Sequence, residues 1–229
     1  MKILAIDTSA RHLSLAIGDH DKILTTMDLS YKKDLSRKIG DHIALEVKKA
    51  RLKFKDLDAV VVGLGPGSFT GLRVGLAAAK ALCFSLDIPL VGISSLDALA
   101  YGVRKKKQDI CVIGDARRKL FYACFYGHEN GTLIRKTDYL LAPLDEILKR
   151  ISGDVIFVGD GIMLAKDDIK ERGFQASFAP PAAWKAQAKY LLVLGAKRLK
   201  NKESDHAATL TPIYLYPEDC QVQQKRVSS

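Results

Sequence analysis

Ile3-Leu4-Ala5-Ile6-Asp7 is the stretch that decides the fold, because a similar stretch, Ile110-Cys111-Val112-Ile113-Gly114-Asp115, returns later in the chain. Each is an apolar run that ends at a carboxylate and is followed, after a short turn, by alternating apolar residues at 13–17 and at 121–125. These patterns predict two hairpins with Asp7 and Asp115 in equivalent places. An apolar strand before a glycine also recurs, at 59–62 and 155–158. We therefore predict an internally duplicated α/β chain; coincidence between two α/β units remains the alternative.

The segments between these strands are expected to form helices. From 36 to 52, Ile39, Ile43 and Val47 recur every four positions, which is typical of an amphipathic helix. Further helices are expected at about 70–86 and at about 182–200, the last of them carrying Trp184 toward the core.

A charged run at 104–109 marks the expected boundary between two lobes, 1–106 and 107–220. The last helix, in the second half of the sequence, is expected to be able to pack back on the first lobe. Residues 221–229 are polar and are expected to form a loose tail.

The composition limits the classes of function. The 229 residues include 36 Lys and Arg against 26 Asp and Glu, a net charge of +10, which suits an anionic partner such as RNA but is also found on solvated surfaces. The four cysteines form no CxxC pair, so reduced thiols and a cytoplasmic location are expected. No membrane span is expected, because Lys80 interrupts the longest apolar stretch.

A glycine-rich loop, from Gly63 to Arg73, lies between a predicted strand and a predicted helix, where backbone N–H groups can bind an anion. The spacing matches neither known phosphate-binding motif. A Walker loop needs a lysine six residues after its first glycine, and GxGxxG needs a third glycine where Ser68 or Thr70 stands. The loop is therefore expected to be a strand-to-helix turn that Ser68 or Thr70 caps.

The hairpin turns after Asp7 and Asp115 suit the phosphate turns of a two-lobed ATPase, but neither has a glycine after the aspartate. In the second turn, Arg117 places positive charge where a metal and a phosphate would lie. Asp7 is therefore expected to brace its hairpin, slightly ahead of a ligand role.

Metal and nucleophilic chemistry are not expected. The five histidines are never three or four positions apart, so no helical metal pair exists and each is expected at the surface. No G-x-S-x-G motif is present. We predict neither a catalytic centre nor a metal site.

The helix after the glycine loop is apolar nearly all round, since only Arg73, Lys80 and Ser85 are polar between 72 and 86. A helix of this kind favours burial on both faces, and Gly75 with the following alanines would let another helix approach closely. This predicts an interface with a partner; complete burial within this chain remains the alternative.

The chain resembles the TsaB (YeaZ) family. The resemblance rests on Ile3 to Ser9, on the specific string GPGSFTGLRVG at 65–75, on GISSL at 92–96, on Asp115-Ala116-Arg117 and on Tyr214-Leu215. It implies an ASKHA fold, the actin-like and Hsp70-like arrangement of two duplicated lobes of mixed sheet with flanking helices.

The resemblance also implies a function. It points to a non-catalytic scaffold that binds and activates TsaD in forming N6-threonylcarbamoyladenosine at position 37 of tRNAs reading ANN codons. TsaE is an implied partner, tRNA is contacted through the complex, and a homodimer is expected when the chain is alone. No cofactor is required by this chain, although ATP or ADP is compatible with the complex interface. The alternative is an independent ASKHA-class kinase or hydrolase acting on a small molecule with ATP.

The family's partner surface is helical, and we carry it onto Leu35, Ile39, Ile43, Val47, Leu72, Arg73, Leu76, Ala77, Lys80 and Phe84. The expected remnant of a nucleotide site comprises Asp7, Thr8, Ser9, Gly65, Gly67, Ser68, Thr70, Asp115 and Arg117.

Overall fold

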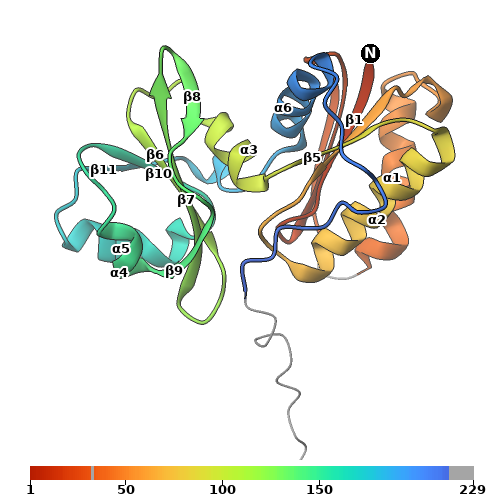
Figure 1. Ribbon diagram of the computed structural model, residues 1–229. Helices are drawn as coiled ribbons and strands as arrows, with labels where there is room; N and C mark the ends of the chain where they lie inside the picture. The colour runs from red at the N-terminus through yellow and green to blue at the C-terminus, as the bar shows by residue number, and fades with distance from the viewer. Residues whose placement is uncertain (32–33, 217–229) are drawn as a thin grey trace, which may run out of the picture.

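The computed structural model describes residues 1–31 and 34–216, which form two lobes, each built on one sheet (Figure 1). The first sheet has the strand order β3-β2-β1-β4-β5. Its strands β1 and β2 are antiparallel, whereas β4 and β5 continue the sheet in parallel with β1. The strands are β1 (Lys2–Asp7), β2 (His12–Asp19), β3 (Lys22–Ser30), β4 (Ala59–Gly63) and β5 (Leu90–Ile93).

The second sheet repeats the first strand for strand. Its order, read from the other edge, is β8-β7-β6-β10-β11, with β9 also pairing with β7. Here β6 and β7 form the antiparallel hairpin, and β10 and β11 are the parallel strands. The predicted duplication is confirmed, and Asp7 and Asp115 both end the first strand of their sheet. The strands are β6 (Asp109–Asp115), β7 (Leu120–Glu129), β8 (Thr132–Arg135), β9 (Leu140–Pro143), β10 (Val155–Val158) and β11 (Ala176–Phe178).

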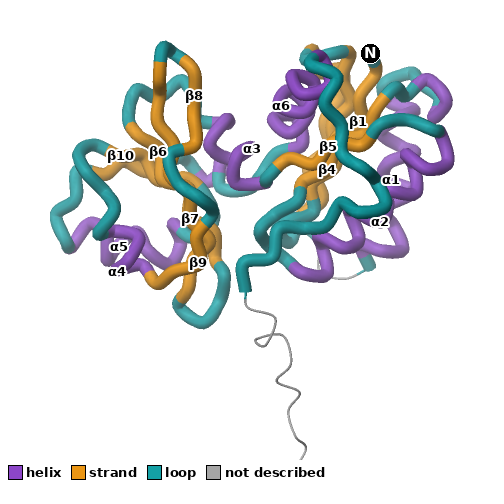
Figure 2. The backbone as a smooth tube through the Cα atoms, in the orientation of Figure 1, coloured by secondary structure: helices purple, strands orange, loops and turns teal. Residues whose placement is uncertain are grey.

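The helices cover both faces of each sheet (Figure 2). On the first sheet, α1 and α2 pack on one face and α6 on the other; on the second, α4 and α5 pack on one face and α3 on the other. The helices are α1 (Leu35–Lys49), α2 (Phe69–Leu86), α3 (Ser95–Gly102), α4 (Leu144–Leu148), α5 (Ile162–Glu171) and α6 (Ala188–Lys200). Short 3₁₀ turns lie at Phe54–Asp56 and Pro181–Ala183.

The last helix of each half crosses to the opposite lobe. Helix α3 follows the first sheet but packs on β6 and β7, and α6 follows the second sheet but packs on β1, β2 and β4. These two helices also contact each other between the sheets, inside one continuous apolar core. The boundary expected at residue 106 therefore separates the two sheets but not the helices that cover them.

The predicted helix at 182–200 is shorter than expected. Pro180 and Pro181 lead into the 3₁₀ turn, and α6 begins only at Ala188. Trp184 thus precedes the helix, where its indole N–H donates to the Ala179 carbonyl at 2.7 Å and its ring packs against the core of the second lobe. The 3₁₀ turn does not continue into α6, because the backbone of Gln187 is extended, with φ of −105° and ψ of 129°.

Helix α2 is long and apolar enough to cross a membrane by length and composition. This corrects the expectation that Lys80 removes every such stretch, since Arg73 and Lys80 together do not lower the mean hydropathy of the helix enough. In this fold α2 packs along β4, with Leu72, Leu76 and Cys83 buried in the core of the first lobe. Core helices of soluble proteins share these properties, so the helix is weak evidence for a membrane span.

The segment after α6 runs back across the first lobe and reaches the second (Figure 1). Asp205 forms a bridge with Leu90 at the edge of β5, and the Ile213 N–H donates to the Leu64 carbonyl at 2.9 Å. The Tyr216 hydroxyl then donates to the Ala116 carbonyl in the second lobe. The tail predicted at 221–229 lies outside the described residues.

Candidate functional site

The carboxylate of Asp7 is fully buried at the end of β1 and is held by three donors. Its Oδ1 accepts hydrogen bonds from the backbone N–H of Ser9 at 2.9 Å and from the Ser9 hydroxyl at 2.7 Å. Its Oδ2 accepts from the Ser95 hydroxyl at 2.7 Å, and that hydroxyl oxygen accepts the Gly65 N–H at 3.2 Å. Hydrogen bonds to a charged group are worth about 1.5–3 kcal/mol each. Asp7 therefore braces the hairpin turn, as predicted.

Three glycines spaced four residues apart form the surface that meets this turn. A Cβ at Gly67 would overlap the carbonyl of Ser9, and a Cβ at Gly71 would overlap the carbonyl of Thr8. At Gly75 it would overlap the Thr8 hydroxyl, which donates to the Gly71 carbonyl at 2.8 Å. The glycines thus let the loop and α2 lie directly against the turn. This corrects the interpretation of Gly75, which accommodates the chain's own hairpin and not another helix.

The start of α2 is fixed at the same contact. The Ser68 hydroxyl accepts the Gly71 N–H at 3.3 Å, whereas Thr70 is exposed, so Ser68 is the cap. The Ser68 N–H in turn donates to the Ser9 carbonyl at 2.7 Å. Gly65 has a φ of +85°, a left-handed conformation that glycine adopts without steric cost.

The first turn and the glycine loop therefore pack directly against each other, with no room for an added Cβ between them. A phosphate-binding turn needs N–H and hydroxyl donors aimed at an open space. Here the Ser9 N–H and hydroxyl both serve Asp7, and the Thr8 hydroxyl serves α2. These three donors of the first turn are therefore engaged within the chain.

The second turn neutralises its own carboxylate. Asp115 Oδ1 accepts the Arg117 N–H at 2.8 Å, and Oδ2 pairs with the Arg117 guanidinium at 2.9 Å. Arg117, Arg118 and Lys119 have φ angles of 69°, 53° and 61°, a left-handed conformation that costs about 1–2 kcal/mol for each residue other than glycine. The structure thus places Arg117 at the carboxylate, which agrees with the prediction that positive charge occupies this turn.

Asp160, which follows β10, supports the second turn through a hydrogen bond to its backbone. Its Oδ1 accepts the Asp115 N–H at 3.0 Å. Burial raises the pKa of the Asp160 carboxyl above its usual value, although the N–H of Asp115 favours the charged form. The nearby charge of Asp115 raises that pKa further.

Six of the ten predicted partner-binding residues lie in the core of the first lobe and are not available to a partner in this fold. The reason is that the apolar stripes of α1 and α2 face the first sheet and each other. The buried six are Leu35, Ile39, Ile43, Val47, Leu72 and Leu76. The other four lie on α2, with Arg73, Ala77 and Phe84 exposed and Lys80 half-buried.

The outer side of α2 is an exposed stripe, which we call the α2 face: Phe69, Arg73, Ala77, Ala81 and Phe84. Phe84 is 92% exposed, the largest value among the exposed large apolar side chains of the described residues. Arg73 lies 3.8 Å from the Phe69 ring centre and donates to the Tyr214 hydroxyl at 3.2 Å, so the chain after α6 fixes this end of the stripe. Small side chains between two aromatic ends permit close approach of another surface.

One histidine differs from the prediction. His12, expected at the surface, is buried at the start of β2, where its Nε2 lies 2.9 Å from the Ala186 carbonyl. Among residues 1–31 and 34–216, no cluster of three His, Cys, Asp or Glu could hold a metal ion.

Sequence reasoning missed Ser95 and Asp160 as partners of the two turns. Ser95 lies within the GISSL string, but nothing local indicates that it reaches Asp7 across 88 positions. For Asp160 a signal existed, because Gly159-Asp160-Gly161 ends a strand that neighbours β6. The spacing of Gly67, Gly71 and Gly75 likewise indicated one small-residue face.

Comparisons with known proteins agree with this geometry. The sequence model described as "TsaD: tRNA N6-adenosine threonylcarbamoyltransferase" matches residues 22–223. The "tRNA threonylcarbamoyladenosine biosynthesis protein TsaB" of Bacillus subtilis is 34% identical over 219 residues, which cover 94% of each chain. The chain belongs to the TsaB family. The strings that resembled this family thus lie mainly where the first turn, the glycine loop and the start of α3 meet.

Solved structures confirm the fold expected of a TsaB family member. YeaZ from Pseudomonas aeruginosa superposes with a TM-score of 0.77 at 22% identity, covering 93% of this chain and 99% of that one. The activator of 2-hydroxyisocaproyl-CoA dehydratase from Clostridium difficile, solved with bound ADPNP, has a TM-score of 0.53 at 13% identity over 90% of this chain and 99% of that one. The predicted ASKHA fold is therefore confirmed.

Proposed function

We propose that this chain is the non-catalytic subunit that binds and activates TsaD in forming N6-threonylcarbamoyladenosine at position 37 of tRNAs reading ANN codons. The observation that carries the proposal is the interlock of Asp7, Ser9 and Thr8 with the glycine loop. In this interlock, the Thr8 hydroxyl and the N–H and hydroxyl of Ser9 donate hydrogen bonds within the chain, and the glycine loop packs against them. The names of its relatives supply the reaction.

The α2 face is the surface proposed to bind TsaD. Its exposed Phe84 and the small side chains before it form an apolar strip on a helix whose other side is packed. The same face would pair two copies when TsaD is absent. The proposal also includes TsaE as a second partner and ATP or ADP at the complex interface. It places the protein in the cytoplasm.

Reconstitution tests the function. TsaD, TsaE, threonylcarbamoyl-AMP synthase, ATP, threonine, bicarbonate and tRNA are combined with and without this chain, and modified adenosine is counted by mass spectrometry. Product should vanish when the chain is omitted, and the chain alone should make none. Unchanged product without the chain would overturn the proposal.

The α2 face is tested by Phe84→Asp, with Met163→Asp as the matched control. Both side chains are exposed, at 92% and 72%, but Met163 lies on α5 of the second lobe. A charge at Phe84 should abolish co-elution with TsaD at micromolar concentration without changing the melting temperature, whereas the control should co-elute normally. Leu76→Asp is unsuitable, because Leu76 is buried and its replacement by a charge would unfold the lobe. Normal co-elution of the Phe84 variant would refute this surface.

The independent kinase or hydrolase stays the competing function. It predicts saturable ATP hydrolysis by the isolated chain and its loss in Asp7→Ala. The internal hydrogen bonds of Asp7 instead predict that this variant loses stability and that the wild-type chain hydrolyses no ATP.

A further inference from the structure

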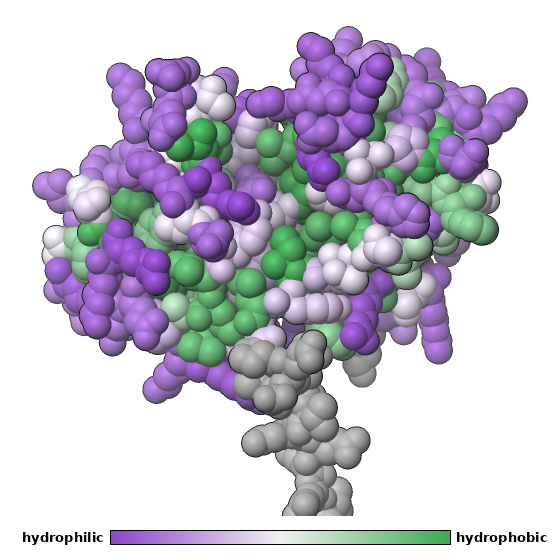
Figure 3. Space-filling model, in the orientation of Figure 1, coloured by the Kyte–Doolittle hydropathy of each residue, from purple (hydrophilic) through white to green (hydrophobic). Residues whose placement is uncertain are grey.

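A large groove lies between the lobes, away from the turns that follow Asp7 and Asp115. It has a volume of about 1370 Å³ and is lined by the β2–β3 turn and α6 of the first lobe and by α3, β7 and β8 around the second. Figure 3 shows hydrophilic side chains on both rims of the notch above α3, between β8 and α6, with apolar surface deeper inside. Neither the interlock nor the α2 face uses this groove.

Most of the charged side chains that line the groove are cationic. Five Lys and Arg side chains face two aspartates, and the cations come from both walls. Lys197 and Lys200 lie on α6, whereas Arg104, Lys105 and Arg135 lie at the end of α3 and of β8. Among residues 1–31 and 34–216, none of the five forms an ion pair with a carboxylate.

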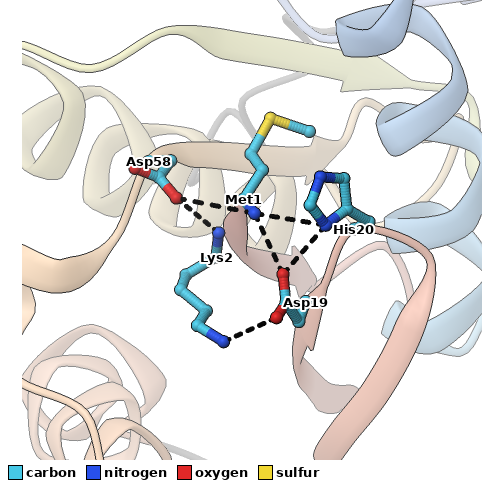
Figure 4. Close-up of polar contacts among 5 residues, drawn as sticks. All are labelled: Met1, Lys2, Asp19, His20 and Asp58. Carbon is cyan, nitrogen blue, oxygen red and sulfur yellow. Dashed lines mark hydrogen bonds and ion pairs between the residues drawn. The ribbon is translucent and has the colours of Figure 1, made fainter.

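Two carboxylates, Asp19 beside the groove and Asp97 in its lining, are already engaged. Figure 4 shows Asp19, beside the groove residues Met1 and His20, contacted by the N-terminal amine at 2.9 Å and by Lys2 at 2.7 Å. The hydrogen bond from Lys2, then those from the N-terminus and His20, hold the pKa of Asp19 below its usual value.

Asp97, on the groove floor, accepts two tyrosine hydroxyls. The Tyr126 hydroxyl lies 2.7 Å from its Oδ1 and the Tyr139 hydroxyl 2.9 Å from its Oδ2. These bonds join α3 to the second sheet and give the groove a fixed floor. The five cations on its walls, which have no ion pair with a carboxylate of the described residues, can therefore attract an anion from outside the chain.

The groove is larger than a typical small-molecule site, which has a volume of roughly 300–1,000 Å³. An array of cations on two facing walls suits a ligand with several phosphates in a row, and RNA presents its phosphates in that way. Tyr101 at the floor lies beneath the Arg104 guanidinium, with 4.0 Å from the guanidinium carbon to the ring centre, an aromatic and cationic pair of the kind on which unpaired bases stack.

We propose that this groove binds a segment of the tRNA substrate through its phosphates, and the proposal rests on the function proposed above. The groove then orients the tRNA, while TsaD, held on the α2 face, performs the chemistry. The two surfaces are formed by different elements, so one can be changed without the other.

The test compares two double variants that change the charge equally. Lys197→Glu with Lys200→Glu alters the groove, whereas Lys166→Glu with Lys170→Glu alters α5, which packs on the face of the second sheet opposite α3. All four lysines are exposed. Binding of a labelled full-length tRNA transcript to the complex with TsaD is followed by fluorescence anisotropy between 50 and 300 mM KCl, on the order of the salt range where such contacts respond.

The groove variant should weaken tRNA binding at least about tenfold and lower the slope of log affinity against log salt by about 1.4–1.8, since each lost phosphate contact removes about 0.7–0.9. The α5 variant should stay within about twofold of wild type. Equal weakening by both variants, or by neither, would overturn the proposal. Lys105→Glu with Arg135→Glu on the opposite wall repeats the test if the α6 variant fails to fold.

Two further readouts separate this proposal from the proposed function. A groove variant that co-elutes with TsaD but binds tRNA weakly supports the groove. A wild-type chain that never binds TsaD, yet binds tRNA in a groove-dependent way, overturns the proposed function and leaves the groove standing. Groove variants that keep their tRNA affinity but lose TsaE assign the groove to an acidic protein surface and overturn the RNA proposal.

Discussion

Gly75→Ala should destabilise the first lobe, although alanine is the better helix former. Position 75 lies inside α2, where replacing glycine by alanine gains about 0.8–1 kcal/mol of helix propensity. The added Cβ would overlap the Thr8 hydroxyl and lie 3.2 Å from the Thr8 Cβ and Cγ2, tighter than ordinary contact. The turn that Asp7 braces would have to move away from α2.

Gly40→Ala isolates the cost of this overlap. Gly40 also lies inside a helix, α1, but is exposed, and nothing lies within 4 Å of an added Cβ. The gain in helix propensity is the same for both variants and cancels in their difference. Overpacking costs about 1–3 kcal/mol, so Gly75→Ala should be less stable than Gly40→Ala by that amount. For a chain of this size the gap in melting temperature is roughly 2–12 °C.

Urea unfolding followed by circular dichroism measures the two free energies of unfolding. Thr8→Ala supplies the second half of a double-mutant cycle, because it removes the hydroxyl and Cγ2 that the new Cβ meets. In that background Gly75→Ala should cost at least about 0.5 kcal/mol less. If Gly75→Ala stabilises the chain as much as Gly40→Ala does, the close contact between turn and helix does not exist.

Two more predictions concern charge and thiols. Burial raises the pKa of Asp205, but the hydrogen bonds from Arg198 and from the Gly92 N–H outweigh burial, so the folded pKa lies below the usual value. Asp205 therefore stabilises the fold at pH values above its unfolded pKa of about 3.9. This stabilisation is lost as the pH falls through the lower folded pKa. Asp205→Asn should therefore cost about 1.5–3 kcal/mol at pH 7 in urea unfolding and almost nothing at strongly acidic pH, whereas a pH-independent cost would contradict the argument. Burial raises the pKa of Cys83 to about 11 and also raises those of Cys111 and Cys124, so all three should resist iodoacetamide at about pH 8 in the native protein and react after unfolding. Peptide mapping by mass spectrometry checks this, and rapid native labelling of any of the three would disprove it.

The sequence predicted the hairpins and the duplication because these depend on local patterns. An apolar run that ends at Asp7 or Asp115, followed by alternating residues, carries its periodicity within a dozen positions. Strand β3 was not predicted, because the consecutive apolar pair at 23–24 and the two threonines at 25–26 interrupt the alternation.

Long-range pairing could not be predicted in this way. The period of Ile39, Ile43 and Val47 shows that one side of α1 is buried, but the period is the same whether the chain's own sheet or a partner covers it. The stripe therefore indicated a partner surface, whereas the fold places it in the core of the first lobe. The crossing of α3 and α6 between lobes also depends only on contacts between distant segments.

By itself, the sequence determined the two duplicated halves, the aspartates that end their first strands and the glycine loop between β4 and α2. Only the tertiary structure decided that Ser95 reaches Asp7, that three glycines press α2 against the first turn, and that cations from both lobes line one groove. The physical reason is that local backbone preferences are set by neighbours along the chain. Which groups satisfy a buried carboxylate, or are left to face solvent, is settled when distant segments pack together.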